Sequence, residues 1–200
     1  MRLLIAIVLA GAACNNSQPG QPGHVDGASG SGNKDAAIAD ASSSSGDGGN
    51  DPFAAARATC IAKINTLRAT KGRTAYTRWT AVESCVDQEV TSDATSGQAH
   101  AAWLSGQYSC NGNGQNECEG QGASGIESCL DQMWNEKDQP ECAGCDACAD
   151  AYNPNCTNCD FFGMTTGHVC GHYVNMSANY FTMAACGFSS LGGWDAINFE

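Results

Sequence analysis

The sequence predicts an α+β domain with many disulfides over residues 53–200. Three stretches with apolar residues at helical spacing come first, and two short strand-like stretches joined by a turn close the chain. Twelve of the 13 cysteines fall within this region, whose length is usual for one compact domain. Together these observations favour a small exported protein that is stabilised by disulfides.

Residues 1–14 have the pattern of an export signal. Arg2 precedes an apolar run that is too short to span a bilayer, and small residues follow it. Cys14 stands where a bacterial lipoprotein signal carries its acylated cysteine, which predicts a lipid anchor at the outer surface. Ala10-Gly11-Ala12 alternatively fits an ordinary cleavage site and a freely secreted chain. Assigning Cys14 to lipid leaves enough cysteines for six disulfides in an oxidising compartment.

Residues 15–52 predict a disordered linker, because Gly, Ser and Asp dominate and larger aliphatic residues are nearly absent. The charge of the chain is −12. Within the domain, all basic residues except Lys137 lie between Arg57 and Arg78, and the acidic residues lie from Glu83 onward. This balance argues against a nucleic-acid partner, which would need a basic face. A solvated helix face is the simplest interpretation of the basic stretch.

Two helices are expected in the first part of the domain. Asp51-Pro52 predicts the start of the first, which should end near Lys71-Gly72. The second should end before Gly97. Their cysteines, Cys60 and Cys85, are candidates for a disulfide between the two helices. The predicted buried stripes are Phe53, Ala56, Cys60, Ile61, Ile64 and Leu67 in the first helix, and Trp79, Val82, Val86 and Val90 in the second.

A third helix and two strands are expected further along. Ser124 and Glu127 have capping-box spacing, which predicts a helix running to about Lys137 and gives Glu127 a structural role. Residues 182–188 and 194–199 predict strands, with turn residues at Leu191-Gly192-Gly193 between them.

A cysteine-rich insert is predicted at 142–159, with the spacing C-x2-C-x2-C-x7-C-x2-C. In a cytosolic protein this spacing would indicate zinc, whereas in an exported chain it favours a disulfide-bonded loop. Five is an odd number, so one of the five cysteines must pair elsewhere, with Cys170 as a candidate. The disulfide candidates are Cys60, Cys85, Cys110, Cys118, Cys129, Cys142, Cys145, Cys148, Cys156, Cys159, Cys170 and Cys186.

The segment Gly171-His172-Tyr173-Val174-Asn175-Met176, followed by Ala185-Cys186-Gly187-Phe188, resembles the signature of the CAP superfamily. These are the cysteine-rich secretory, antigen 5 and pathogenesis-related 1 proteins. Val174 and Asn175 stand where the usual pattern has Thr and Gln. The resemblance covers most of residues 58–199 and implies the α-β-α sandwich of that family.

The resemblance also implies a cleft with two histidines and two glutamates. His100 and His172 match the histidines, Glu136 and Glu117 match the glutamates, and Glu119 is the alternative to Glu117. Two neutral imidazoles suit Zn²⁺ or another divalent cation, and the glutamates could orient them or act as catalytic bases. From spacing alone, a hydrogen-bonded core histidine is the alternative interpretation of His172, and His168 is expected in a loop.

The leading functional hypothesis is a secreted or lipid-anchored binding module with a divalent-metal cleft. Its partner would be an extracellular ligand or surface, a lipid or sterol among the candidates, and Tyr173 and Tyr180 would lie at the rim of the cleft. One alternative is a metal-dependent, protease-like hydrolase that uses Glu117 or Glu136 as general base. Another is a purely structural module of the cell envelope, so whether the chain is an enzyme is left open.

Overall fold

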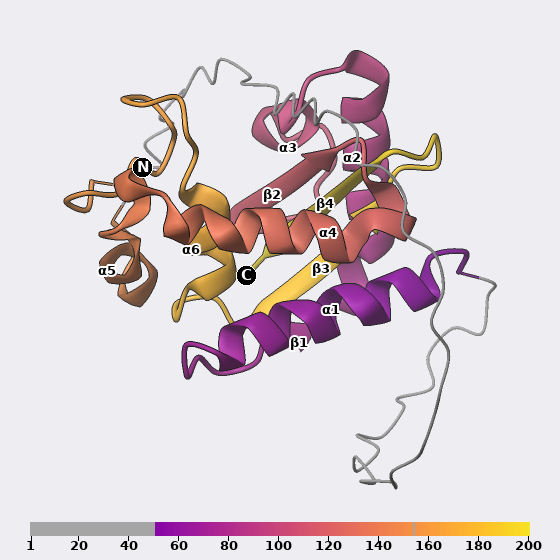
Figure 1. The fold of residues 1–200 in the computed structure, drawn as a ribbon. Coiled ribbons are helices and arrows are strands. Elements are labelled where there is room, and N and C mark those ends of the chain that lie inside the picture. The colour runs from indigo at the N-terminus through magenta and orange to yellow at the C-terminus, as the bar shows by residue number, and fades with distance from the viewer. Residues whose placement is uncertain (1–50, 154) are drawn as a thin grey trace, which may run out of the picture. The chain divides into compact units, whose positions relative to one another are not determined.

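A four-stranded sheet lies at the centre of the computed structural model, which describes residues 51–153 and 155–200 (Figure 1). The predicted export signal, Cys14 and nearly all of the predicted linker lie outside the described residues. The strand order is β1-β3-β4-β2; β3 and β4 are antiparallel, β2 is antiparallel to β4, and β1 is parallel to β3. The strands are β1 (Thr77–Arg78), β2 (Gly114–Glu119), β3 (Met183–Phe188) and β4 (Trp194–Phe199).

Helices lie on both faces of the sheet (Figure 1). No helix among the described residues is both long and apolar enough to cross a bilayer. The helices are α1 (Ala54–Ala69), α2 (Glu83–Ser96), α3 (Ala101–Ser105), α4 (Gly122–Asn135), α5 (Cys145–Asp150) and α6 (Gly171–Ser177), with 3-10 turns η1 (Thr80–Val82), η2 (Glu136–Asp138) and η3 (Pro140–Cys142).

The alternation of side chains along β3 and β4 produces two separate cores. One face packs against α1, α4 and α6, and the other packs against Val86 and Val90 of α2. Gly187 lets α2 approach closely, because a Cβ atom there would lie 2.6 Å from Val86 Cγ1. The first face consists of Ala184, Cys186, Phe188, Ile197 and Phe199, and the second of Ala185 and Ala196.

Two predicted helix starts are wrong, and one helix was not predicted. α1 begins at Ala54 with Phe53 as its N-cap, after Asp51-Pro52. α4 begins at Gly122, because the chain leaves β2 through two glycines with positive φ, and Ser124 already lies in the first helical turn. The segment Gly171–Ser177, where no helix was expected, forms α6.

All twelve cysteines of the domain form disulfides, as predicted, but the proposed pairing of Cys60 with Cys85 is wrong. The reason is that Cys60 lies in the α1-side core and Cys85 packs against the α2-side core, so the sheet separates them. Cys142 pairs with Cys170, as the odd count in the insert suggested. The pairs are Cys60–Cys186, Cys85–Cys110, Cys118–Cys129, Cys142–Cys170, Cys145–Cys159 and Cys148–Cys156.

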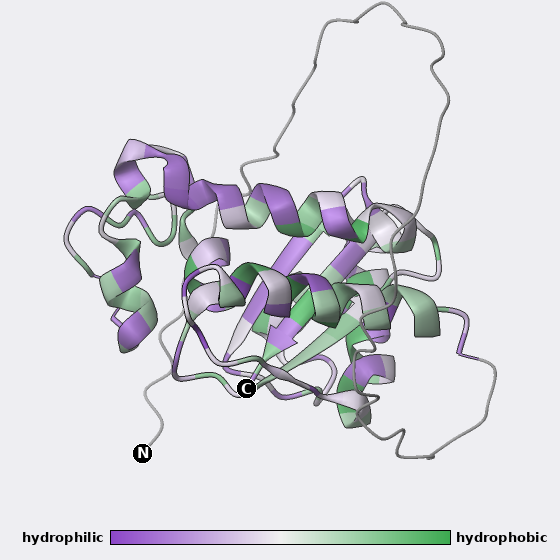
Figure 2. Cartoon of the chain, turned by 60° about the horizontal axis from the view of Figure 1, so that its bottom comes forward, coloured by the Kyte–Doolittle hydropathy of each residue, from purple (hydrophilic) through white to green (hydrophobic). Residues whose placement is uncertain are grey.

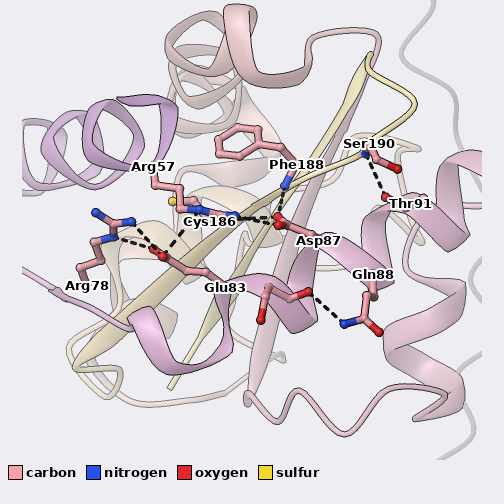
Figure 3. Close-up of polar contacts among 10 residues, drawn as sticks. Arg57, Arg78, Glu83, Asp87, Gln88, Thr91, Cys186, Phe188 and Ser190 are labelled. Atoms are coloured by element: carbon pink, nitrogen blue, oxygen red, sulfur yellow. Dashed lines mark hydrogen bonds and ion pairs between the residues drawn. The ribbon is translucent and has the colours of Figure 1, made fainter. Parts of the chain in front are cut away.

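The basic stretch at Arg57–Arg78 is partly buried, in contrast to the expected solvated face. Figure 3 shows two of its arginines, Arg57 and Arg78, in contact with acidic side chains. Arg57 is 3% exposed; its Nη2 lies 2.7 Å from Asp87 Oδ2, and its Nη1 donates to the carbonyl oxygen of Cys186 at 2.5 Å. Arg78 Nε donates to Glu83 Oε1 at 2.6 Å, and Glu83 Oε2 lies 3.7 Å from Arg57 Nε. These cations therefore connect α1, α2 and the sheet.

Candidate functional site

The four residues that the resemblance singled out come together from four different elements. His100 is the N-cap of α3, Glu117 lies in β2, Glu136 opens η2 directly after α4, and His172 lies in α6. The two imidazole rings are 6.4 Å apart between centroids and inclined by 30°. The fold therefore places histidines from distant parts of the sequence beside each other.

Glu136 holds His172 and the helix that carries it. Glu136 Oε1 lies 2.5 Å from His172 Nδ1, and Oε2 accepts the backbone N–H of Tyr173 at 3.0 Å. A carboxylate at the N-terminus of a helix satisfies an unpaired N–H and stabilises that end. Burial alone would lower the pKa of His172, but the charge of Glu136 and its hydrogen bond outweigh burial and raise it.

His100 is oriented by a chain of side-chain amides. Its Nδ1 lies 2.8 Å from Gln115 Oε1. Gln115 Nε2 donates to Asn198 Oδ1 at 2.9 Å and to Glu89 Oε2 at 3.3 Å, which fixes the orientation of the amide. Since an amide oxygen only accepts, Nδ1 of His100 carries the hydrogen and Nε2 keeps its lone pair. Burial lowers the pKa of His100 to about 4, so the ring is neutral at pH 7.

Glu117 fixes the backbone at His100. Its Oε2 accepts the His100 backbone N–H at 2.6 Å, where His100 has a φ of +62°, a left-handed value that is uncommon outside glycine. Glu117 Oε1 is buried without a hydrogen-bond partner among the described residues. Burial is the main reason that the pKa of Glu117 is raised to about 9, so its carboxyl is neutral at pH 7.

Asp93 of α2 fixes the backbone just after His100. Its Oδ1 accepts the backbone N–H of Ala102 at 2.7 Å, which holds the first turn of α3. Burial raises the pKa of Asp93, against a smaller lowering by the backbone N–H of Ala102 and by the neighbouring Glu117. A neutral Glu117 beside Asp93 avoids two buried negative charges in contact.

The arrangement leaves one ring nitrogen of each histidine available. Nδ1 of His100 and Nδ1 of His172 are both engaged with acceptors, and such partners orient histidines that bind metals through the other nitrogen. Among the described residues, the groups that bring three metal-ligating atoms within 4.8 Å of one another involve disulfide cysteines and neither His100 nor His172. At the paired histidines, His100 and His172 are therefore the two side chains that could hold an ion, each through Nε2, with other positions left for water or a ligand.

Other residues singled out from the sequence lie outside this arrangement. Tyr173 is 1% exposed, so its predicted position at the rim is wrong, whereas Tyr180 is half-buried. Glu119 is exposed at the end of β2. The His168 side chain is 65% exposed in a loop, as predicted, with Nε2 3.8 Å from Glu141.

The buried side-chain amides that link β2 to α6 at the site were not predicted from the sequence. Asn116 Nδ2 donates to the His172 carbonyl oxygen at 3.0 Å, and Asn175 Nδ2 donates to Asn116 Oδ1 at 2.9 Å. These amides and Gln115 are hydrophilic, as Figure 2 shows for β2, yet all three are buried. Gln115 and Glu117 are two residues apart in β2 and therefore point to the same face of the sheet, but this mostly polar segment gave no sequence signal of a strand.

No protein-family model matches this chain, and no curated protein matches it. A groove of about 620 Å³ runs along α2 and contains neither histidine. Its lining residues include Phe53, Thr91 and Tyr108.

Proposed function

We propose that this chain is an exported CAP-like binding module whose cleft holds a divalent cation, with Zn²⁺ as the best match. The observation that carries the proposal is the pair of imidazoles, His100 and His172, each fixed through Nδ1 and each with Nε2 left as a ligand atom. Zn²⁺ accepts such nitrogen ligands and tolerates open positions for an exogenous ligand. Helices on both faces of a four-stranded sheet support the α-β-α sandwich of that family.

Under this proposal, the bound cation supplies a Lewis-acidic point at which an acidic or carbonyl-bearing extracellular ligand is held. The protein's own residues orient the two histidines that hold the cation. Glu136 fixes the ring of His172, Gln115 fixes the ring of His100, and Glu117 holds the backbone that presents it. The resemblance extends the proposal to a lipid or sterol ligand and to a location at the outer surface, either lipid-anchored through Cys14 or secreted.

The carboxyl groups favour binding over the alternative of a metal-dependent hydrolase. A general base must accept a proton at the working pH. Glu117 is neutral at pH 7, and both oxygens of Glu136 already accept hydrogen bonds from His172 and Tyr173. A purely structural module with no metal would keep the same hydrogen bonds. A measurement of metal binding therefore distinguishes the binding module from the structural module.

A calorimetric titration of the oxidised chain with Zn²⁺ tests the proposal. We expect one site near neutral pH, weakened at least 100-fold in His100→Ala and in His172→Ala, because each variant removes one of two imidazole ligands. His168→Ala, a loop histidine outside the cleft, is the matched control and should bind as the wild type does. The preparation must be free of thiols so that the cysteines cannot bind the ion. Absence of binding, or binding that neither cleft variant weakens, would refute the proposal.

A further inference from the structure

The cysteine-rich segment gathers the sulfur atoms of two disulfides into one cluster. The Sγ atoms of Cys142, Cys145 and Cys170 all lie within 4.8 Å of one another. Cys142 is bonded to Cys170, and Cys145 is bonded to Cys159, so the fourth sulfur is adjacent. All four cysteines are buried; the most exposed, Cys159, is 8% exposed. Two disulfides therefore lie side by side in the same part of the core.

Backbone hydrogen bonds hold these four positions together independently of the sulfur–sulfur bonds. The N–H of Gly144 donates to the Asn158 carbonyl at 2.8 Å, which joins the segment containing Cys145 to the segment before Cys159. The N–H of Asp160 donates to the Glu141 carbonyl at 3.1 Å, and the N–H of Cys170 donates to the Asp160 carbonyl at 3.2 Å. The four sulfur atoms would therefore stay close together after reduction.

We propose that reduction converts this pair of disulfides into a tetrathiolate zinc site made of Cys142, Cys145, Cys159 and Cys170. Each disulfide accepts two electrons and two protons from one dithiol reductant, which becomes its own cyclic disulfide. The four thiols then lose four protons as their thiolates bind one Zn²⁺. The site exists only in the reduced protein: two equivalents of a disulfide oxidant, each taking up two electrons and two protons to become a dithiol, release the ion and restore the two disulfides.

The geometry fits this ligand set. Tetrahedral zinc binds thiolates at about 2.3 Å, which places the sulfur atoms about 3.8 Å apart. The sulfur atoms of Cys142, Cys145 and Cys170 already lie within 4.8 Å of one another, so reaching that spacing requires mainly that each broken disulfide opens, including the one that joins Cys159 to Cys145. Cys142 and Cys145 also have the C-x2-C spacing of structural zinc sites.

The other disulfides offer poorer sites. Cys118, Cys129 and Asp195 form the second group within 4.8 Å, but this group contains only two sulfur atoms. Cys148 and Cys156 belong to neither group, and Cys156 is partly exposed. The Cys148–Cys156 pair lies in the same insert and therefore provides a matched control.

Cobalt titration of the reduced full-length chain tests the proposal. The protein is reduced with a dithiol, which is then removed anaerobically, and Co²⁺ is added as a spectroscopic substitute for Zn²⁺. We expect the intense visible bands of tetrahedral cobalt thiolate to saturate at one equivalent and to disappear when Zn²⁺ is added. The bands should be lost in the Cys145→Ser/Cys159→Ser double variant and retained in Cys148→Ser/Cys156→Ser. They should also persist in His100→Ala/His172→Ala, which separates this site from the cleft.

Alkylation of the unmodified sequence provides a second test that does not depend on a variant that folds. Zn²⁺ should protect Cys142, Cys145, Cys159 and Cys170 of the reduced chain from iodoacetamide, as read from peptide masses, and leave Cys148 and Cys156 reactive. Absence of thiolate bands would overturn the proposal. Equal loss of the bands in both double variants, or protection of a different set of cysteines, would also overturn it.

Discussion

Replacing Arg68 with alanine should lower the free energy of unfolding of the oxidised domain by about 3–5 kcal/mol. Arg68 is 1% exposed and donates to three backbone carbonyl oxygens. Its Nε reaches the carbonyl of Thr74 at 2.8 Å, and its Nη1 reaches those of Met176 at 2.7 Å and Ala178 at 2.9 Å. Alanine removes all three charge-assisted bonds and leaves buried acceptors without their donor.

The effect should reach the candidate site, because Arg68 holds the end of the helix that carries His172. The last carbonyls of a helix have no partner within it, and a cation there is stabilising. Tyr76 supports the same end through its hydroxyl, which lies 2.8 Å from the Asn175 carbonyl and 2.9 Å from that of Ala178. The guanidinium of Arg68 stacks 3.5 Å above the centre of the Tyr76 ring. Losing Arg68 therefore also removes the packing that positions Tyr76.

Urea unfolding of the oxidised chain measures this change, with Lys63→Ala as the control. Lys63 is on the same helix, and its ion pair with Asp131 is partly exposed, so the control should change stability by less than about 1 kcal/mol. We also expect Arg68→Ala to weaken Zn²⁺ binding at the cleft, whereas Lys63→Ala should not. If the two variants unfold at similar urea concentrations, Arg68 does not have the anchoring role assigned to it.

The elements that could be predicted are those with a local hydrophobic period. The apolar spacing in α1, α2 and α4 and the turn between β3 and β4 are properties of neighbouring residues, so the sequence displays them. β2 was missed because its residues, Gly114–Glu119, are mostly polar and buried by partners from elsewhere in the chain. α6 is short, and its N-terminus is stabilised by Glu136, a long-range contact with no local signal.

The candidate site shows the same division between local and long-range information. His100, Glu117, Glu136 and His172 were identified by resemblance to a motif, and they do come together. The partners that orient them, such as Gln115, depend on which side chains the fold brings into contact. Disulfide pairing is equally long-range, because Cys60 and Cys85 are on adjacent helices in sequence but on opposite sides of the sheet.

A second large effect is expected at Asp195, where Asp195→Asn should change how stability depends on pH. Asp195 of β4 is fully buried, and neither carboxyl oxygen has a hydrogen bond of standard geometry among the described residues. Burial raises its pKa to about 8, against a smaller lowering by the backbone N–H of Gly122. In the unfolded chain an aspartate titrates near 3.9.

The sign follows from proton binding. Below about pH 4, Asp195 is protonated in both the folded and the unfolded state, so it does not make the free energy of unfolding depend on pH. Between about pH 4 and pH 8 the unfolded state loses the proton and the folded state keeps it, so stability falls by up to about 1.4 kcal/mol per pH unit. Above about pH 8, the pKa of Asp195 in the folded protein, both states are ionised and Asp195 lowers the stability no further. Burial likewise raises the pKa of Glu89 to about 7 and of Glu117 to about 9, so these groups contribute slopes of the same sign.

Urea unfolding at pH 5 and pH 8 isolates the contribution of Asp195. The substitution changes packing by a similar amount at both pH values, whereas the titration penalty is present only in the wild type. The stability of Asp195→Asn relative to wild type should therefore rise by about 2–4 kcal/mol between pH 5 and pH 8. Asp138→Asn, at a side chain that is 65% exposed, controls for the change in charge. Parallel pH profiles for Asp195→Asn and wild type would show that Asp195 is ionised in the folded protein, and that a group not yet identified stabilises its charge.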